Sequence, residues 1–254
     1  MKTLNHHRIR IITTGANGKM GSQITRTALN FPQIVHVAAL VRNKSPFAYQ
    51  DIGKLANITP IGILAHDNIE EIKSEFDILI DFTSPNSSLE YLDFCCKNKK
   101  NIIIGTTGFD KYQKKIIKKM SKYIAIFFSS NFSYGISIIL NLLEKTLHTI
   151  DINNFDIDII EMHHKKKIDT PSSTAIEIHN CIKNKLKNNI NITSIRLGDI
   201  VGEHKIIFSF FGEKIEITHC VHNRNAFSLG VIKAAIWLYQ KQPGLFDMKN
   251  IFNK

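Results

Sequence analysis

Short apolar runs alternate with amphipathic segments over the first half of the chain. The runs are rich in Ile and Val and are bounded by turn residues, as is typical of parallel strands buried on both faces. The segments between them carry apolar residues three or four positions apart, the spacing of one helix face. This alternation predicts an α/β fold with a Rossmann-like, doubly wound parallel sheet. The runs lie at 9–14, 35–41, 77–83, 101–107 and 124–130, and the helix faces are Met20, Ile24 and Ala28, then Leu89, Leu92 and Cys96, then Tyr112, Ile116 and Met120.

One of these helices also carries a start signal. Asp110 is followed three residues later by Gln113, which is typical of an N-cap residue with its capping-box partner. The sequence therefore predicts that the third helix begins just after Asp110.

The pattern changes after about residue 132. Residues 133–150 predict a long helix, and 155–160 (FDIDII) alternate apolar and acidic residues, like a strand with one solvated face. Residues 204–224 predict two strands that turn at Gly212, which is an antiparallel hairpin. A further helix carries Ala175, Ile178, Ile182 and Leu186, and 226–240 is helical again.

These changes predict two domains. We expect residues 1–132 and 225–254 to form a dinucleotide-binding domain, into which an α+β domain, residues 133–224, is inserted.

Composition narrows the class of protein. Of the 254 residues, 43% are hydrophobic and 22% charged, which is ordinary for a soluble globular protein. A formal net charge of +11 would suit nucleic acid, a membrane surface or an acidic small molecule. The Lys residues are spread over many segments and form no stripe interleaved with aromatic residues. We therefore expect solvated surface charge, with neither nucleic acid nor a membrane as partner.

The cysteines and the N-terminus indicate the compartment. The four cysteines include an adjacent pair and no C-x-x-C, so neither a zinc site nor a disulfide framework is predicted, as in a reducing compartment. The first 15 residues contain no apolar signal region, and no apolar run approaches the roughly 18 residues of a membrane span. We expect a cytoplasmic protein without a metal.

A glycine-rich turn follows the first predicted strand. Gly15, Gly18 and Gly21 lie three apart in TTGANGKMG. Such glycines let the backbone approach a pyrophosphate at a helix N-terminus, although a strand and a helix can also need them for packing alone. By itself the turn would equally suit a short-chain dehydrogenase or a sugar-nucleotide epimerase.

The end of the second strand indicates which nucleotide binds. A site for NAD usually carries Asp or Glu there to bind the ribose hydroxyls. This chain has Val41 at that position, followed by Arg42 and then Lys44. Since Arg grips a phosphate with paired N–H donors, the sequence favours NADPH, with NADH as the alternative cofactor. Arg42 as a plain loop charge is the other interpretation.

The most reactive stretch is EMHHKKKIDTPSSTA, Glu161 to Ala175. His163, His164 and Lys167 follow a predicted strand, and His is the side chain best suited to exchange protons near neutral pH. A predicted helix then starts near Pro171, and its free N–H groups would hold a carboxylate. We expect a site for a carboxylated anion here, with Lys165 and Lys166 left as solvated loop. Adjacent His residues without other ligands make zinc improbable.

A missing residue pair excludes the most obvious rivals. Short-chain dehydrogenases and epimerases need a Tyr four residues before a Lys, and none of the six Tyr residues has one. The proton donor must come from elsewhere, and the His and Lys cluster is the strongest candidate.

At this point several motifs in order identify a family. The chain resembles the dihydrodipicolinate (4-hydroxy-tetrahydrodipicolinate) reductases over nearly its whole length. The motifs are GANGKMG, DFTSP, GTTGFD, SSNFSYGI, EMHHKKKIDTPSSTA, GDIVGEH, EITH and GLFDM. The resemblance implies an oxidoreductase that reduces 4-hydroxy-tetrahydrodipicolinate to tetrahydrodipicolinate with NADPH or NADH, in lysine and diaminopimelate biosynthesis.

The resemblance also implies roles for individual residues. His163 and Lys167 match the catalytic pair that handles protons, and His164, Ser173 and Thr174 match the groups that bind the substrate carboxylates. The implied cofactor residues are Gly15, Ala16, Asn17, Gly18, Lys19 and Met20 at the pyrophosphate, Arg42 at the 2′-phosphate, and Gly105, Thr106, Thr107, Ser129, Ser130, Asn131 and Phe132 around the nicotinamide.

Two departures from the family pattern stand out. Ser173 occupies a position where the family usually has Gly, and it would strain a backbone that needed a positive φ by about 1 kcal/mol or more. Second, the segment before Gly198 is short, NNINITSIRL. In the family this region contributes to subunit contacts. A homotetramer is implied by the resemblance, and the short segment leaves open which homo-oligomer forms.

Two other functions remain open. One is a different NADP-dependent reductase of a cyclic or imino dicarboxylate on the same fold. The other is a non-enzymatic module whose basic surface binds nucleic acid.

Overall fold

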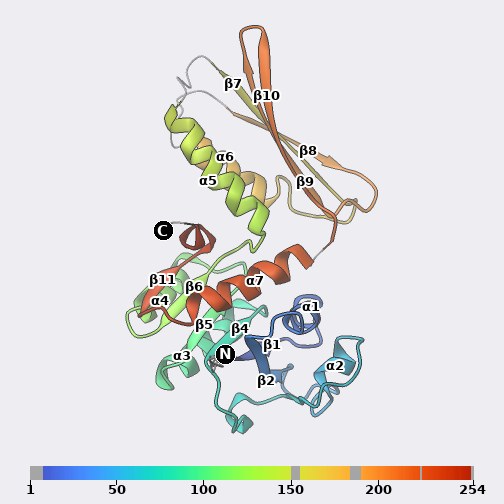
Figure 1. Ribbon diagram of the computed structural model, residues 1–254, viewed down its shortest axis with the longest axis vertical. Coiled ribbons are helices and arrows are strands. Elements are labelled where there is room, and N and C mark those ends of the chain that lie inside the picture. The colour runs from blue at the N-terminus through green and yellow to red at the C-terminus, as the bar shows by residue number, and fades with distance from the viewer. Residues whose placement is uncertain (1–7, 150–154, 184–189, 224, 253–254) are drawn as a thin grey trace, which may run out of the picture. The chain divides into compact units, whose positions relative to one another are not determined.

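The computed structural model describes residues 8–149, 155–183, 190–223 and 225–252 (Figure 1). By its internal contacts the chain divides into two units. The first takes the chain up to Phe132 together with Phe227–Ile251, and the second takes Ser133–Ala226 and Phe252. The roles assigned to the two domains from the sequence stay predictions.

A seven-stranded sheet forms the centre of the first unit. Its strand order is β11-β6-β5-β4-β1-β2-β3, and every neighbouring pair is parallel. The order reverses between β1 and β4, which is where ligands bind to such sheets, at the carboxyl ends of the strands. The predicted doubly wound sheet is therefore confirmed. The strands are β1 (Ile9–Thr14), β2 (Ile34–Leu40), β3 (Ala65–His66), β4 (Ile78–Asp81), β5 (Asn101–Ile104), β6 (Ala125–Phe128) and β11 (Gly244–Phe246).

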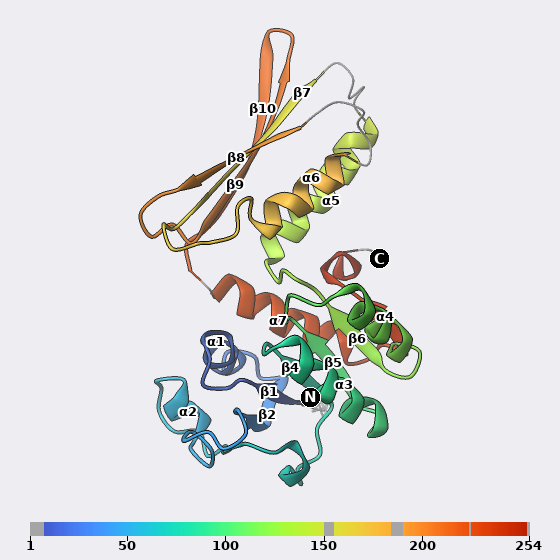
Figure 2. The ribbon, with the colours of Figure 1, turned by 180° about the vertical axis from the view of Figure 1, so that it is seen from behind.

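Helices cover both faces of this sheet (Figures 1 and 2). One face packs Ile12 and Leu79 against Leu92 of α3 and Ile117 of α4. On the other face the ring of Phe127 lies 6.2 Å from Trp237 of α7. The helices are α1 (Lys19–Ala28), α2 (Ile52–Leu55), α3 (Pro85–Lys97), α4 (Lys111–Met120) and α7 (Asn225–Leu238), with 3-10 turns η1 (Ile69–Glu71) and η3 (Met248–Ile251).

Helix α4 confirms one prediction and corrects another. Its N-cap is Asp110, and both bonds of the capping box with Gln113 are present. The predicted apolar face is wrong at its first position, because Tyr112 is 72% exposed while Ile117 is fully buried. A Tyr in the first turn keeps its polar tip in water, so the buried face is centred one residue further along than the four-residue spacing indicated.

The second unit is a four-stranded sheet with two helices on one face (Figures 1 and 2). The strand order is β10-β9-β7-β8, in which β7 and β8 are parallel and the other pairs antiparallel. The unit is thus the α+β insertion that the sequence predicts. Its elements are α5 (Tyr134–Thr149), β7 (Asp156–His163), α6 (Ser173–Lys183), β8 (Asn191–Arg196), β9 (Gly202–Phe210) and β10 (Glu213–Val221).

The core of this unit lies between the sheet and its helices. Ile157 and Ile159 of β7 pack on Leu143 of α5 and Ile178 of α6, whereas Asp158, between the two isoleucines, is exposed. The alternation read from FDIDII therefore sets which face of β7 is buried. Leu186, assigned to the helix from its spacing, lies outside the described residues. Among the residues described, no helix is long and apolar enough to cross a membrane.

Candidate active site

The turn between β1 and α1 needs its glycines for two different reasons. Gly15 has a φ of +62°, which side chains with a Cβ adopt only with strain. A Cβ on Gly21 would lie 2.2 Å from the Gly15 carbonyl oxygen, so this glycine lets α1 pack on the turn. Gly18 is the N-cap of α1, and no side chain caps it. The first N–H groups of α1 are therefore available to an anion.

A cavity of about 680 Å³ opens beside this turn. It brings Gly15, Asn17 and Gly18 together with Val41 and Arg42, as predicted from segments that lie far apart in the sequence. Ala16, Lys19, Met20 and the residues after β5 and β6 do not line it. The remaining lining residues are Asn43, Lys44, Ser45, Pro46 and Phe47 after β2, and Phe82, Thr83, Ser84, Ser87 and Tyr91 after β4.

The charges at this cavity suit a phosphate. Val41 is 2% exposed, so an apolar side chain fills the position of the usual carboxylate. The nearby Asp67 accepts the backbone N–H of Lys44 at 2.9 Å and does not line the cavity. Arg42 is exposed, and no ion pair engages it within the described chain. Its guanidinium is thus free to bind a ligand.

Sequence reasoning missed a buried carboxylate that ties the loops of this edge together. Asp81, at the end of β4, is fully buried. It accepts hydrogen bonds from Thr14 at 2.7 Å, Thr83 at 2.6 Å and Thr106 at 2.8 Å, and from Ser88. These hydroxyls lie at the end of β1, after β4 and after β5, so one side chain ties three neighbouring strand ends together.

The predicted nicotinamide residues lie in the segments after β5 and β6. The side chain of Thr106 is engaged by Asp81, whereas Thr107 is exposed. After β6, Ser129 donates to the carbonyl of Asn131 at 2.7 Å. Phe132 is 2% exposed and packs on Phe82 and Phe127, so its side chain belongs to the core and only its backbone can face a ligand. Ser130 is exposed, and Gly105 packs against Phe82.

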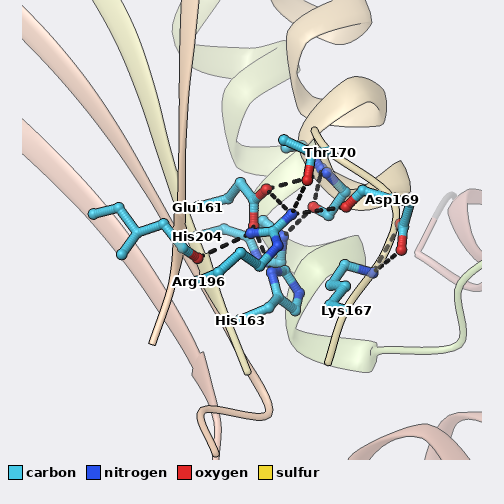
Figure 3. Close-up of polar contacts among 10 residues, drawn as sticks. Glu161, His163, Lys167, Asp169, Thr170, Arg196 and His204 are labelled. Carbon is cyan, nitrogen blue, oxygen red and sulfur yellow. Dashed lines mark hydrogen bonds and ion pairs between the residues drawn. The ribbon is translucent and has the colours of Figure 1, made fainter. Parts of the chain in front are cut away.

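In the second unit, β7 ends in a buried cluster (Figure 3). Glu161 and His163 lie two residues apart and project from the same face of β7. The carboxylate of Glu161 lies 2.5 Å from Nδ1 of His163 and accepts two N–H groups of Arg196, at 2.8 and 3.0 Å. Burial alone would raise the pKa of Glu161, but hydrogen bonds from Arg196 and His163 outweigh it and lower this pKa to about 2. Glu161 is therefore an anion.

Two histidines face each other in this cluster. The rings of His163 and His204 are 5.2 Å apart and nearly perpendicular, and Nε2 of His204 lies 3.1 Å from the Ser172 hydroxyl. Burial lowers the pKa of His204 to about 3 and also lowers the pKa of His163, against the attraction of Glu161. Both rings are neutral near pH 7. His204 was missed from the sequence, although it closes the motif GDIVGEH.

The loop after His163 carries the other predicted residues. Lys167 is paired with Asp169, at 2.8 Å to both carboxylate oxygens. Ser173 and Thr174 begin α6, as the predicted helix start requires. Nδ1 of His164 is buried without a hydrogen-bond partner. Lys165 and Lys166 are exposed, in keeping with a solvated loop.

The structure answers one question about Ser173. This residue is helical and is not among the residues with a positive φ, so a Ser in place of Gly does not strain the backbone. Within the part of the chain that is described, no three His, Cys, Asp or Glu side chains are grouped to hold a metal ion.

A doubly wound sheet with a glycine-rich turn after its first strand, joined in one chain to an α+β unit, is the architecture of two-domain nicotinamide-dependent oxidoreductases. The comparisons with known proteins specify the family. Residues 9–132 match the family model described as dihydrodipicolinate reductase, N-terminus, and residues 135–252 match its C-terminus. The chain belongs to the dihydrodipicolinate reductase family.

Individual relatives agree with this assignment. The 4-hydroxy-tetrahydrodipicolinate reductase of Wigglesworthia glossinidia brevipalpis is 63% identical over 248 residues, covering 97% of this chain and 94% of that protein. The one from Buchnera aphidicola subsp. Baizongia pistaciae is 44% identical over 267 residues, covering 96% and 98%. Among solved structures, a dipicolinate-bound dihydrodipicolinate reductase from Paenisporosarcina sp. TG-14 superposes with a TM-score of 0.78 over 96% of this chain and 99% of that one, at 24% identity, and so supports the fold.

These findings confirm the family, the fold class and the enzyme class predicted from the sequence. The chain is an oxidoreductase of a family that uses a nicotinamide cofactor and serves lysine and diaminopimelate biosynthesis. The assignment of single residues and the choice between NADPH and NADH stay predictions.

Proposed function

We propose that the chain reduces 4-hydroxy-tetrahydrodipicolinate to tetrahydrodipicolinate, with NADPH preferred over NADH. The observation that carries the proposal is the cluster at the end of β7, where a histidine held by a buried carboxylate lies beside a lysine and a helix N-terminus. This is the set of groups that a reduction of an anionic ring needs, since the dicarboxylate must be bound and a proton supplied.

The proposed cofactor site is the cavity beside the glycine turn. The N–H groups of α1 and the close approach at Gly15 and Gly18 would hold the pyrophosphate. Arg42 and Lys44 line the same cavity and would bind the 2′-phosphate, while Val41 offers no carboxylate to the ribose. When bound, the reduced nicotinamide supplies a hydride to the conjugated ring that remains after water leaves.

The chain's own residues would bind the substrate and move the proton. His164 and the N–H groups of Ser173 and Thr174 would bind the carboxylates, since a helix N-terminus favours an anion. His163, paired with Lys167 in handling the proton, would donate it to the carbon that becomes electron-rich after hydride addition. Its pKa is lowered by burial in the free protein, and a bound dianion would raise it by favouring the protonated ring.

A coupled assay with the preceding synthase tests this proposal, with NADPH and NADH compared in parallel. His163→Ala and Lys167→Ala should each lower kcat/KM by roughly 10²–10⁴-fold. Lys165→Ala is a matched control, because this exposed lysine of the same loop should leave turnover unchanged. Arg42→Met should raise the KM for NADPH and not that for NADH. Normal turnover by His163→Ala would remove it from the mechanism, and a preference for NADH would contradict the role of Arg42. Faster turnover of another imino dicarboxylate would replace the substrate.

We infer further that the second unit is the substrate-binding and oligomerisation domain. The sheet face opposite α5 and α6 carries Ile160, Met162, Ile195 and Ile207, which is a typical contact surface when it is left open. Sedimentation of the wild type should show a homo-oligomer, and Met162→Lys should shift it to smaller species. A monomeric wild type would contradict this inference.

We also propose that the protein is cytoplasmic. Its support is that all four cysteines are unpaired, as is usual in a reducing compartment. Cell fractionation with antibody detection tests this location.

A further inference from the structure

Glu161 neither binds the substrate nor moves a proton in the proposed function, yet its carboxylate is held at both oxygens. Its side chain is completely buried. Both oxygens are engaged: Oε1 accepts from Arg196 at 2.8 Å and from the Ser172 backbone at 3.2 Å, and Oε2 accepts from Arg196 at 3.0 Å and faces His163 at 2.5 Å. Burying a carboxylate is expensive unless it is paired, so a function must be sought in what it holds.

The ionisation of Glu161 decides which nitrogen of His163 carries hydrogen. An ionised carboxylate can only accept hydrogen bonds. Because Nδ1 of His163 lies within hydrogen-bond distance of this acceptor, Nδ1 must be the donor. A neutral His163 therefore has its proton on Nδ1 and a bare lone pair on Nε2.

Gly202, which has no side chain, lies beside Nε2 of His163. A Cβ on Gly202 would lie 3.1 Å from Nε2 of His163 and 3.4 Å from its Cδ2. No hydrogen bond joins Nε2 to a side chain of the described residues. The side chain of His163 is 10% exposed, so the ring is held at Nδ1 and is not completely shielded from solvent.

Arg196 connects this pair to the loop that carries Lys167. Besides Glu161, its guanidinium donates to the backbone oxygen of Asp169 at 2.7 Å and to the hydroxyl of Thr170 at 3.1 Å (Figure 3). The charged and titratable groups around His163 are thus Glu161 on its own strand, Arg196 on β8, His204 on β9 and Lys167 on the loop. Among these, only Glu161 bonds the ring.

We propose that Glu161, fixed by Arg196, is a positioning residue that keeps the proton of neutral His163 on Nδ1 and so makes Nε2 the atom that exchanges a proton with the substrate. This rests on the proposed role of His163. Glu161 does not touch the substrate in this proposal; it sets the tautomer and the orientation of the group that does.

NMR of ¹⁵N-histidine-labelled protein tests the tautomer directly, without any turnover. At a pH where the ring is neutral, wild-type His163 should show a protonated Nδ1 and a bare Nε2, with its signals identified by their loss in His163→Ala. In Glu161→Gln the amide can donate to Nδ1, so the proton should move to Nε2. A wild-type ring with hydrogen on Nε2 would overturn the proposal even if no variant folds.

Kinetics give the second readout. Glu161→Gln should lower kcat by roughly 10²–10⁴-fold. This is the range of general acid–base catalysis, and an Asp-to-Asn change beside the catalytic histidine of a serine protease, which gives the wrong tautomer, has an effect at its upper end. Glu161→Asp keeps an ionised acceptor and should retain the Nδ1 proton and recover part of the rate. The kcat/KM of an enzyme that needs protonated His163 falls as the pH rises through the pKa of His163, and Glu161→Gln should move this fall to lower pH, because a neighbouring anion is lost.

The outcomes separate the two proposals. If Glu161→Gln loses turnover while the proton stays on Nδ1, or if the proton moves and kcat is unchanged, the positioning role is wrong. If His163→Ala also turns over normally, the proposed function of His163 has failed, whatever the NMR result.

Discussion

Removing the guanidinium of Arg196 should destabilise the second unit in a way that depends on pH. Arg196→Met keeps a side chain of similar length and removes the charge that offsets Glu161. Two hydrogen bonds to the carboxylate are lost, at 2.8 and 3.0 Å. A completely buried anion is then left with weaker partners.

The size of the effect follows from two estimates. The fall in the pKa of Glu161 from 4.5 to about 2 corresponds to about 3 kcal/mol of stability at neutral pH. Breaking a buried pair by removing one partner costs roughly 3–5 kcal/mol. Since the Ser172 backbone N–H and His163 still donate to Glu161, and His163 can take up a proton to balance it, we expect about 2–3 kcal/mol.

The direction of the pKa shift of Glu161 sets the sign of the pH dependence. A carboxylate whose pKa is lowered in the folded state stabilises above its unfolded value of 4.5 and loses this contribution as the pH falls toward 2. The wild type has this contribution and Arg196→Met has little of it. The difference in stability between them should therefore be largest near neutral pH and should shrink below pH 4.5.

Urea unfolding followed by two signals measures this. Trp237, the one tryptophan of the chain, lies on α7 against Phe127 of the first unit, so its fluorescence reports on that unit, whereas far-ultraviolet circular dichroism reports on both. In Arg196→Met the dichroism should begin to change at a lower urea concentration than the fluorescence. Lys214→Met, which breaks an exposed pair with Glu216, serves as the control and should unfold like the wild type. Equal stability of Arg196→Met and wild type at neutral pH, or a difference that stays constant below pH 4.5, would refute the reasoning.

Five further substitutions test other parts of the structure. Gly21→Ala should lower stability by about 1–3 kcal/mol and weaken cofactor binding in a fluorescence titration, because a Cβ there meets the Gly15 carbonyl. Asp81→Asn should also weaken cofactor binding, with a loss of about 1–3 kcal/mol in urea unfolding; an unchanged dissociation constant would mean that the loops do not need it. Ser173→Gly should lower thermal stability by up to about 1 kcal/mol, and a more stable variant would reveal strain at Ser173. Ile117→Ala should cost roughly 2–5 kcal/mol, whereas Tyr112→Ala should change stability by less than about 0.5 kcal/mol.

Elements with a periodic apolar pattern could be predicted, and short ones could not. The runs that became β1, β2, β4, β5 and β6 each bury apolar residues on both faces, and the pattern alone identifies them. Strands β3 and β11 have two and three residues, too few for any period to be visible. Strand β8 was missed for another reason, since its segment NITSIR offers only two apolar residues between polar ones.

Some residues of the candidate site could be predicted from local motifs, and others could not. The glycine turn, Arg42 and the His163 cluster are local motifs, so residue type and spacing are enough to find them. Asp81, Arg196 and His204 act through partners that the fold supplies, and Arg196 lies 35 residues from Glu161. Glu161 itself gave a usable signal, because an acidic residue two positions before a histidine in a strand shares its face.

The short segment before Gly198 can be interpreted through this network. If its shortening had displaced β8, Arg196 would be lost and Glu161 would be a buried, unpaired anion. Instead β8 pairs with β7 from Asp158 opposite Asn191 to His163 opposite Arg196, so the register places Arg196 directly beside the end of β7. The residues that remain in the short segment include β8, which positions this guanidinium. The charge of Glu161 therefore limits how short the segment can become. However long the connection is, it must still place a cation of β8 beside this carboxylate.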